Sequence, residues 1–304
     1  MDSIDVLKRP VDGADAEIVQ IGRGRMKGRL TRATIGDLAF SKGAFSLPIR
    51  ASGIFSQTRL TLGILLQCTS VRDISGSAAL PGDIFLVPPK FDHHNVYGGP
   101  ASFAAMTIDS IELTMLFAGE SVLSDPGYWS RRQRCRSLNP RAALAIEPRL
   151  RAVFALLAKQ QPLSDRATNY LRRAIVEGFA APLATITGHN EASTASSPIK
   201  IVKEIEAYVD ARRDRPIHIS ELCSFVNVSR RTLHRCFEDV VGIGPSAFLR
   251  HKRLCSVHSE LRRLDPQTTR VTQIATEFGF IELSRFARQY RLLFGEYPHE
   301  TLHR

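Results

Sequence analysis

Residues 272–298 read TQIATEFGFIELSRFARQYRLLFGEYP and carry the clearest structural signal in the chain. Apolar residues recur at helical spacing over residues 272–278 and again over about residues 283–294. Gly279 and Phe280 begin the break between these two runs, and Gly295 ends the second one. The stretch therefore predicts two short helices around a tight turn, which is a helix-turn-helix unit.

The same pattern occurs 53 residues earlier. The matched pairs are Leu233 with Phe286, Arg235 with Arg288, Phe237 with Tyr290, Gly242 with Gly295, and Pro245 with Pro298. In this first copy, residues 220–226 predict a short helix and residues 227–229 a turn. Ser229 is the expected N-cap of a second helix that runs to about residue 240. The repeat therefore predicts two helix-turn-helix units in one domain.

A helix predicted over residues 246–264 joins the two units. At roughly 1.5 Å per residue, a helix of this length spans nearly 30 Å. Successive major grooves on one side of B-DNA lie about 34 Å apart. The linking helix can therefore hold two recognition helices one DNA turn apart.

Residues 198–304, about a third of the chain, resemble the DNA-binding domain of the AraC/XylS regulators. The second unit carries the signature Ile274-Ala275, Gly279-Phe280, Ser284, Phe286, Arg288, Tyr290, Phe294-Gly295 and Pro298, and the first unit adds Ser229, Leu233, Arg235, Phe237, Gly242, Pro245 and the following FLRHKRL. Tyr297 and the ending HETLHR depart from the family pattern, and we expect them to affect packing. The resemblance implies a sequence-specific transcription regulator, a ligand-responsive activator, that acts on double-stranded DNA together with RNA polymerase.

The outward faces of the two recognition helices supply the candidate DNA contacts. Leu233 with Phe237, and Phe286 with Tyr290, are apolar i, i+4 pairs that should pack inward. By the resemblance, the base-contacting residues are Arg231, His234, Arg235, Ser284, Arg285 and Arg288, and the phosphate-contacting residues are Ser229, Arg230 and Arg291. Solvated helix faces are the alternative, and Arg235 and Arg288 could instead pair with an acidic residue inside the domain.

The rest of the chain predicts an α+β protein. Over residues 1–145, short apolar runs at 59–67, 83–87 and 102–108 lie between turn-forming residues, which favours a β-sandwich or barrel resembling the family's cupin-like sensing domain. Residues 146–187 predict a helical hairpin that dimerises, and residues 188–198 a flexible linker. Residues 199–304 then form the all-α DNA-binding domain.

The predicted sensing domain offers few specific motifs. His93-His94 lack the His-x-His, Glu and second His of a catalytic cupin, so we expect no metal, no cofactor and no catalytic residues. Arg25 and Arg29 have the RxxxR spacing of some cyclic dinucleotide binders, but the companion motif fails at Ala78. The family implies a small-molecule effector here, although the domain could serve dimerisation alone.

Composition agrees with a cytoplasmic protein that has a polyanionic partner. The formal net charge is +11, and the five dispersed cysteines favour reduced thiols. The charged N-terminus is unlike a signal peptide, and no apolar run approaches a membrane span. A cupin-type enzyme or a DNA-repair methyltransferase with this kind of domain remains an alternative. The first needs a metal triad or paired carboxylates, and the second needs clustered cysteines.

Overall fold

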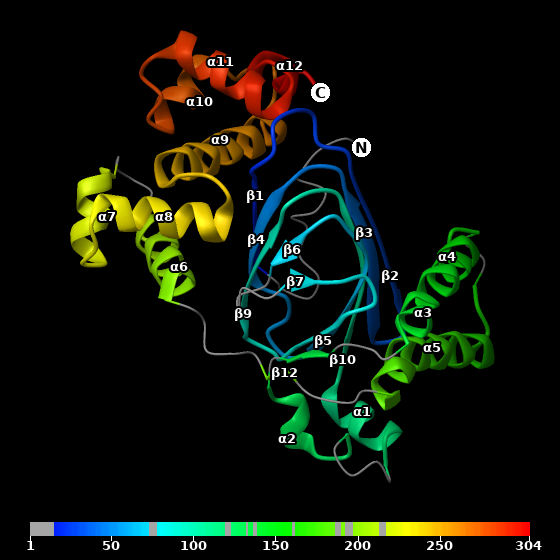
Figure 1. The fold of residues 1–304 in the computed structure, drawn as a ribbon. Helices are drawn as coiled ribbons and strands as arrows, with labels where there is room; N and C mark the ends of the chain where they lie inside the picture. Colours follow the sequence, from blue (N-terminus) through cyan, green and yellow to red (C-terminus); the bar gives the residue numbers. More distant parts are fainter. Residues whose placement is uncertain are drawn as a thin grey trace.

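The computed structural model describes residues 15–72, 78–118, 123–131, 133–135, 139–159, 162–185, 190–191, 197–212 and 217–304. Within these residues the chain folds into an N-terminal β-domain with flanking helices and an all-α C-terminal domain (Figure 1). This confirms the α+β architecture predicted from the sequence. No helix of the described part is both long and apolar enough to cross a membrane.

Two antiparallel sheets build the β-domain from the described residues. The first has the order β1-β4-β9-β6-β7, with β1 Asp15–Gln20, β4 Ile49–Ile54, β9 Asp92–Tyr97, β6 Val71–Arg72 and β7 Ala78–Ala79. The second has the order β12-β11-β8-β5-β10-β3-β2, with β12 Asn190–Glu191, β11 Gln133–Cys135, β8 Ile84–Val87, β5 Leu60–Cys68, β10 Ala101–Ile108, β3 Leu38–Phe45 and β2 Gly28–Ile35. The three apolar runs singled out in the sequence are β5, β8 and β10.

Several helices cover one side of the second sheet. They are α1 Ser110–Leu116, α2 Pro126–Trp129, α3 Pro140–Leu144, α4 Ile146–Leu157, α5 Asp165–Ala180 and the 3-10 helix η2 Ala181–Thr185. The α4–α5 pair is the predicted hairpin, and Ser164 caps α5 through a bond from the Ala167 amide. Phe154 of α4 packs on Phe40 of β3, with ring centroids 5.2 Å apart.

The apolar stripe of this hairpin is buried within the chain. Leu150, Ile175 and Phe179 are each at most 1% exposed and belong to the core beneath the second sheet. This stripe is therefore not free to form the interface of the dimer that the sequence predicts. Leu156 and Tyr170 remain exposed on the hairpin, at 38% and 74%.

The C-terminal domain consists of helices in the described residues. They are α6 Ser197–Asp210, α7 Ile219–Phe225, α8 Arg230–Val241, α9 Pro245–Arg263, α10 Val271–Glu277, α11 Leu283–Phe294 and α12 Pro298–Leu302. The sequence did not predict α6 individually. The expected flexible linker is shorter than residues 188–198, because Asn190–Glu191 pair with β11 and α6 begins at Ser197.

The two domains share part of one core. Val19 and Ile21, in and just after β1, are buried in the same apolar cluster as Leu233, Phe237 and Tyr290 of the helical domain. Side chains of adjacent strand residues point to opposite faces, so Ile18 of β1 packs instead in the β-domain. This dual packing explains why β1 lies against α9 (Figure 1).

Candidate DNA-binding surface

The first helix-turn-helix unit consists of α7, a four-residue connection over residues 226–229, and α8. Asn227 in this connection has φ 50°. The Ser229 hydroxyl caps α8 by accepting a hydrogen bond from the Thr232 amide at 3.1 Å. Gly242 ends α8 in the left-handed conformation with φ 81°. Pro245 then begins α9 at a position where a missing amide hydrogen costs nothing.

The second unit repeats this arrangement with α10 and α11. Gly295 ends α11 at φ 71°, as Gly242 ends α8. The predicted bounds of α10 are displaced by one residue, and those of α11 agree with the structure. The 19-residue helix α9 joins the units, as predicted.

The inner face of each recognition helix is fixed by its apolar pair. Leu233 and Phe237 of α8 are fully buried, and Phe286 and Tyr290 of α11 are at most 2% exposed. Because these residues face inward, the polar residues on the opposite side of each helix face outward. All nine predicted contact residues are exposed: Ser229, Arg230, Arg231, His234, Arg235, Ser284, Arg285, Arg288 and Arg291.

Local partners differ among the exposed residues. His234 lies 3.7 Å from the Glu238 carboxylate, and Arg285 lies 3.7 Å from that of Glu282. Arg291 donates to the Tyr297 hydroxyl at 2.5 Å, and its guanidinium lies 4.6 Å from the centre of that ring. Tyr297, the residue that departs from the family pattern, therefore orients an exposed cation.

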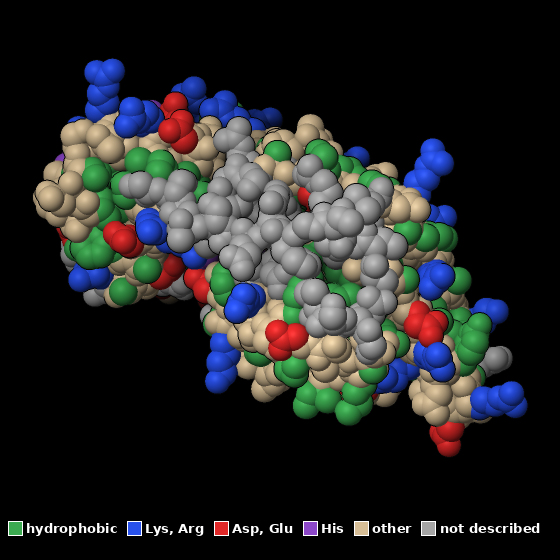
Figure 2. Space-filling view, turned by 60° about the horizontal axis from the view of Figure 1, so that its bottom comes forward, with side chains coloured by type: hydrophobic (Ala, Val, Ile, Leu, Met, Phe, Trp, Pro, Cys, Tyr) green, Lys and Arg blue, Asp and Glu red, His purple; other side chains and the backbone are tan. Residues whose placement is uncertain are grey.

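Arg235 and Arg288 lie at equivalent positions of the two units. Among the described residues, no hydrogen bond or ion pair joins either guanidinium to a carboxylate. In the space-filling view of Figure 2, Lys and Arg side chains project along the outline of the molecule. This distribution agrees with the net charge of +11.

A buried polar cluster supports the end of α11. Glu296 is 6% exposed and accepts a hydrogen bond from the Thr301 hydroxyl at 2.7 Å. Its other carboxylate oxygen forms an ion pair with the Arg304 guanidinium at 2.5 Å, and His258 of α9 lies 3.7 Å from the carboxylate. Burial alone would raise the pKa of Glu296, but its bonds to His258 and Thr301 and the charge of Arg304 lower that pKa to about 2. The unusual C-terminal residues therefore pack α12 and α9 against the second unit, as expected.

A cavity of about 140 Å³ lies inside the β-domain. Its lining is mainly apolar and includes Ile49, Phe55 and Phe103, with Tyr97 at one side. Two buried polar atoms of lining residues, Thr61 Oγ1 and Asn95 Oδ1, have no hydrogen-bond partner in the described structure. An unpaired buried acceptor is costly unless a ligand or water satisfies it.

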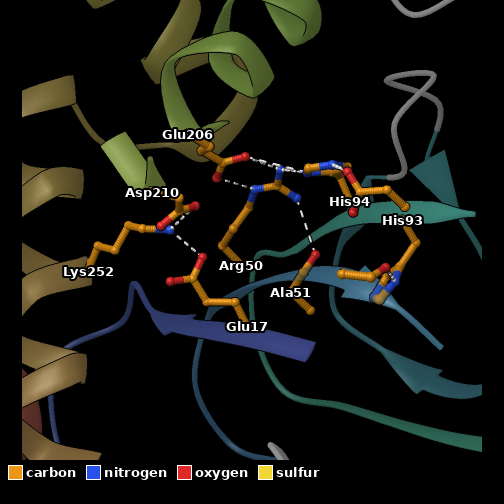
Figure 3. Close-up of polar contacts among 10 residues, drawn as sticks. Glu17, Arg50, Ala51, His93, His94, Glu206, Asp210 and Lys252 are labelled. Carbon is orange, nitrogen blue, oxygen red and sulfur yellow. Dashed lines mark hydrogen bonds and ion pairs between the residues drawn. The ribbon is translucent and has the colours of Figure 1, made fainter. Parts of the chain in front are cut away.

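The strands that line this cavity also hold the helical domain (Figure 3). Arg50 of β4 donates to both carboxylate oxygens of Glu206 on α6, at 3.0 and 2.7 Å, and contacts His94 of β9. Both side chains of the Arg50–Glu206 pair are at most 6% exposed. Burial would raise the pKa of Glu206, but Arg50 and His94 lower it to about 2, so the carboxylate is charged at neutral pH. Lys252 of α9 adds ion pairs with Glu17 and Asp210.

His93 and His94 have separate surroundings. His93 is 2% exposed, stacks on Phe55 and bonds to the Gly53 carbonyl, whereas His94 bonds to Asp92 at 2.6 Å. No group of three metal-ligating side chains occurs among the residues that the structure describes. The cysteines present there are free, and Cys236 and Cys255 are buried. No sequence motif indicates that His94 contacts the other domain.

Comparison with known proteins identifies the helical domain. Residues 222–304 match a family of helix-turn-helix domains. The XylDLEGF operon transcriptional activator of Pseudomonas putida is 31% identical over 100 residues, 33% of this chain and 31% of that protein. The C-terminal domain is therefore similar to the DNA-binding domains of AraC/XylS regulators. A probable thc operon regulatory protein of Rhodococcus erythropolis is 33% identical over 102 residues, 34% of this chain and 31% of the relative.

The relatives named here each match about a third of this chain. The matched part spans about a third of the length of these curated relatives. Among solved structures, a probable AraC family transcriptional regulator from Rhodopseudomonas palustris is 39% identical over 34% of this chain and 95% of that chain, with a TM-score of 0.32. The two curated relatives named here are regulators of operons.

Proposed function

We propose that the chain is a sequence-specific DNA-binding transcription regulator that reads two adjacent major-groove segments. One observation carries this proposal: two structurally equivalent helices each bury an apolar pair and expose arginines on the opposite face. Arginine can bond to guanine O6 and N7 in the major groove, and a cationic surface also attracts the phosphates. The proposed base-reading and phosphate-binding residues are those named from the sequence.

Selection from a random pool of duplexes tests this function. The full-length chain should enrich one sequence and bind it more tightly than a scrambled duplex. Arg230→Ala should weaken binding to both duplexes and flatten the dependence of the affinity on salt, as expected for a lost phosphate contact. A correctly folded chain that enriches no sequence would refute the proposal.

We further propose that this regulator is an activator that contacts RNA polymerase in the cytoplasm. The support is that the Pseudomonas putida relative is a transcriptional activator. A reporter gene placed behind an enriched sequence tests the direction of control. Expression that falls when the protein is supplied would make it a repressor instead.

The cavity supports a small-molecule effector as a finer part of the proposal. An apolar cavity near 150 Å³ can hold a benzene-sized molecule. The unpaired oxygens of Thr61 and Asn95 call for a ligand that carries a hydrogen-bond donor. We therefore propose a compact, mainly apolar effector with a hydroxyl or amine group.

Strand geometry gives this effector a route to the DNA-binding domain. Ile49 and Ala51 of β4 line the cavity, whereas Arg50 between them points to Glu206 of α6. His93 and Asn95 of β9 line the cavity in the same way, while His94 lies beside the ion pair. A ligand that displaces β4 or β9 therefore acts directly on the Arg50–Glu206 ion pair between the domains.

A homodimer remains a proposal that rests on the exposed Leu156 and Tyr170 of the hairpin. Light scattering at tens of micromolar protein tests it. A monomer both with and without duplex DNA would count against it.

A further inference from the structure

The turn after β1 carries a dense run of cations next to the second recognition helix. Residues 22–29 read GRGRMKGR and hold four basic residues and no acidic one. Arg23, Arg25, Lys27 and Arg29 are all exposed. Figure 1 shows this dark blue segment rising from β1 to the end of the helical domain that holds α11 and α12. The function proposed above gives no role to this segment.

Backbone contacts fix the turn to the end of α11. The Gly24 amide donates to the Leu293 carbonyl at 3.0 Å, and the Gln20 side-chain amide donates to the same carbonyl at 2.6 Å. That amide nitrogen also lies 2.8 Å from the carbonyl oxygens of Gly22 and Gly24, so it holds the turn closed. Gln20 itself is fully buried.

The fit at Gly295 shows how closely the two segments approach. A Cβ atom at this position would lie 2.9 Å from the backbone nitrogen of Arg25. Gly295 has φ 71°, so the position favours glycine for its backbone conformation as well. The turn is therefore docked against α11 by its main chain, and this leaves its arginine side chains at the surface.

Arg23 borders the outward stripe of the recognition helix. One shallow concave surface is lined by Arg23 and Gly24 together with Ser284, Ala287, Arg288 and Arg291 of α11. The last four residues repeat at helical spacing and include three of the predicted DNA contacts. Arg23 thus extends the candidate DNA-binding surface of α11 with a cation from the other domain.

The electrostatic surroundings favour an anion at this surface. Burial lowers the pKa of His251 to about 4, and the charges of Arg250 and Arg23 contribute to that shift. Glu296, the acidic residue next to Gly295, is buried and bonded to Thr301 and Arg304. Its charge is therefore compensated inside the domain and does not neutralise Arg23.

We propose that Arg23 binds a DNA phosphate beside the half-site that α11 reads, so that the β-domain takes part in DNA binding directly. This inference rests on the proposed function, because it assumes that α11 lies in a major groove. Arg23 is then a phosphate-binding residue, and Gln20 is the positioning residue that holds its turn on α11. Such a contact adds affinity without base preference.

The test uses the full-length chain and the duplex that the wild-type protein enriches. Arg23→Ala should weaken binding about 3- to 10-fold and reduce the slope of log K against log salt by about 0.9. Arg23→Lys should restore most of the affinity because it keeps the charge. Arg166→Ala, which removes an exposed arginine from α5 on the far side of the β-domain, is the charge-matched control and should bind like the wild type.

A phosphate scan locates the contact. A neutral methylphosphonate is placed in turn at each phosphate around the half-site that Arg288 reads. One flanking substitution should weaken the wild type and have no further effect on Arg23→Ala. An Arg23→Ala chain with unchanged or tighter binding, or an unchanged scan, overturns the inference. A wild-type chain that enriches no duplex overturns the proposed function itself.

Discussion

His93 lies inside the β-domain, where its ring stacks on Phe55 with centroids 3.6 Å apart. Burial lowers the pKa of this imidazole to about 3, and the neighbouring charges of His94 and Arg50 act in the same direction. The unfolded chain therefore binds a proton below about pH 6.5 that the folded chain binds only near pH 3. The neutral imidazole contributes stability above pH 6.5, and that stability is lost as the pH falls toward 3.

We predict that the free energy of unfolding decreases by about 1.4 kcal/mol per pH unit from His93 alone over this range. His93→Asn removes the titrating group and should flatten the pH profile by that amount. Urea unfolding between pH 7 and pH 4 measures both slopes. Parallel profiles for the variant and the wild type would mean that His93 is protonated in the folded chain.

For individual residues, the sequence predicted the positions of exposed side chains better than the partners of buried polar ones. The i, i+4 apolar pairs on α8 and α11 fixed which residues face outward, because a helix allows one such choice. Arg50 and Glu206 gave no such signal. They are 156 residues apart, and their pairing depends on how two domains pack. Gln20 was missed for the same reason.

Two glycines, one on each strand that flanks β10, differ in how closely they are packed. Strand β10 pairs with β3 on one side and β5 on the other. A Cβ atom at Gly43 of β3 would lie 2.4 Å from the Phe103 ring, whereas one at Gly63 of β5 would have no neighbour closer than 3.9 Å. Only the first glycine is required by packing.

Gly43→Ala should therefore lower the free energy of unfolding by about 1–3 kcal/mol, because the Phe103 ring must move. Gly63→Ala should raise it by about 0.4–1 kcal/mol, since alanine restricts the unfolded chain and fits the site. Urea denaturation of both variants measures the difference. Equal effects would mean that Phe103 does not occupy the space above Gly43.

The helices from α7 to α11 were predicted to within about one residue, because Ser229 caps α8 and glycines end α8 and α11. The 53-residue repeat marks the corresponding helix ends in both units, so each end could be predicted from two copies. The role of β1 could not be predicted, since a single strand gives no sign that Val19 packs in one domain and Ile18 in the other. Burial of the hairpin stripe could not be predicted for a related reason, because the extent of the covering sheet is a tertiary property.

In the whole molecule, the Arg50–Glu206 ion pair joins two domains that the sequence suggested would be independent. Arg50→Met leaves a charged carboxylate buried without its main partner, and this should lower the free energy of unfolding by about 3–5 kcal/mol. The double variant Arg50→Met/Glu206→Leu replaces both charges by apolar groups and should recover most of the loss. A double-mutant cycle in urea measures the coupling.

Solution scattering gives a second measure of how the Arg50–Glu206 ion pair holds the two domains together. The radius of gyration of Arg50→Met should exceed that of the double variant, because the unpaired Glu206 favours separated domains. Identical scattering and strictly additive free energies would show that the two side chains do not hold the domains together.

In the proposed complex, the two equivalent helices α8 and α11 read two adjacent major-groove segments. Base preference measured by duplex selection with the wild type, Arg235→Ala and Arg288→Ala tests it most directly, after circular dichroism has shown that each variant is folded. Each variant should lose about 1–3 kcal/mol of specific binding and relax base preference in one half of the site. The two affected positions should lie about 10 base pairs apart, because α9 separates the units by one DNA turn. Relaxed preference at the same base step in both variants, or unchanged preference in either, would contradict the account.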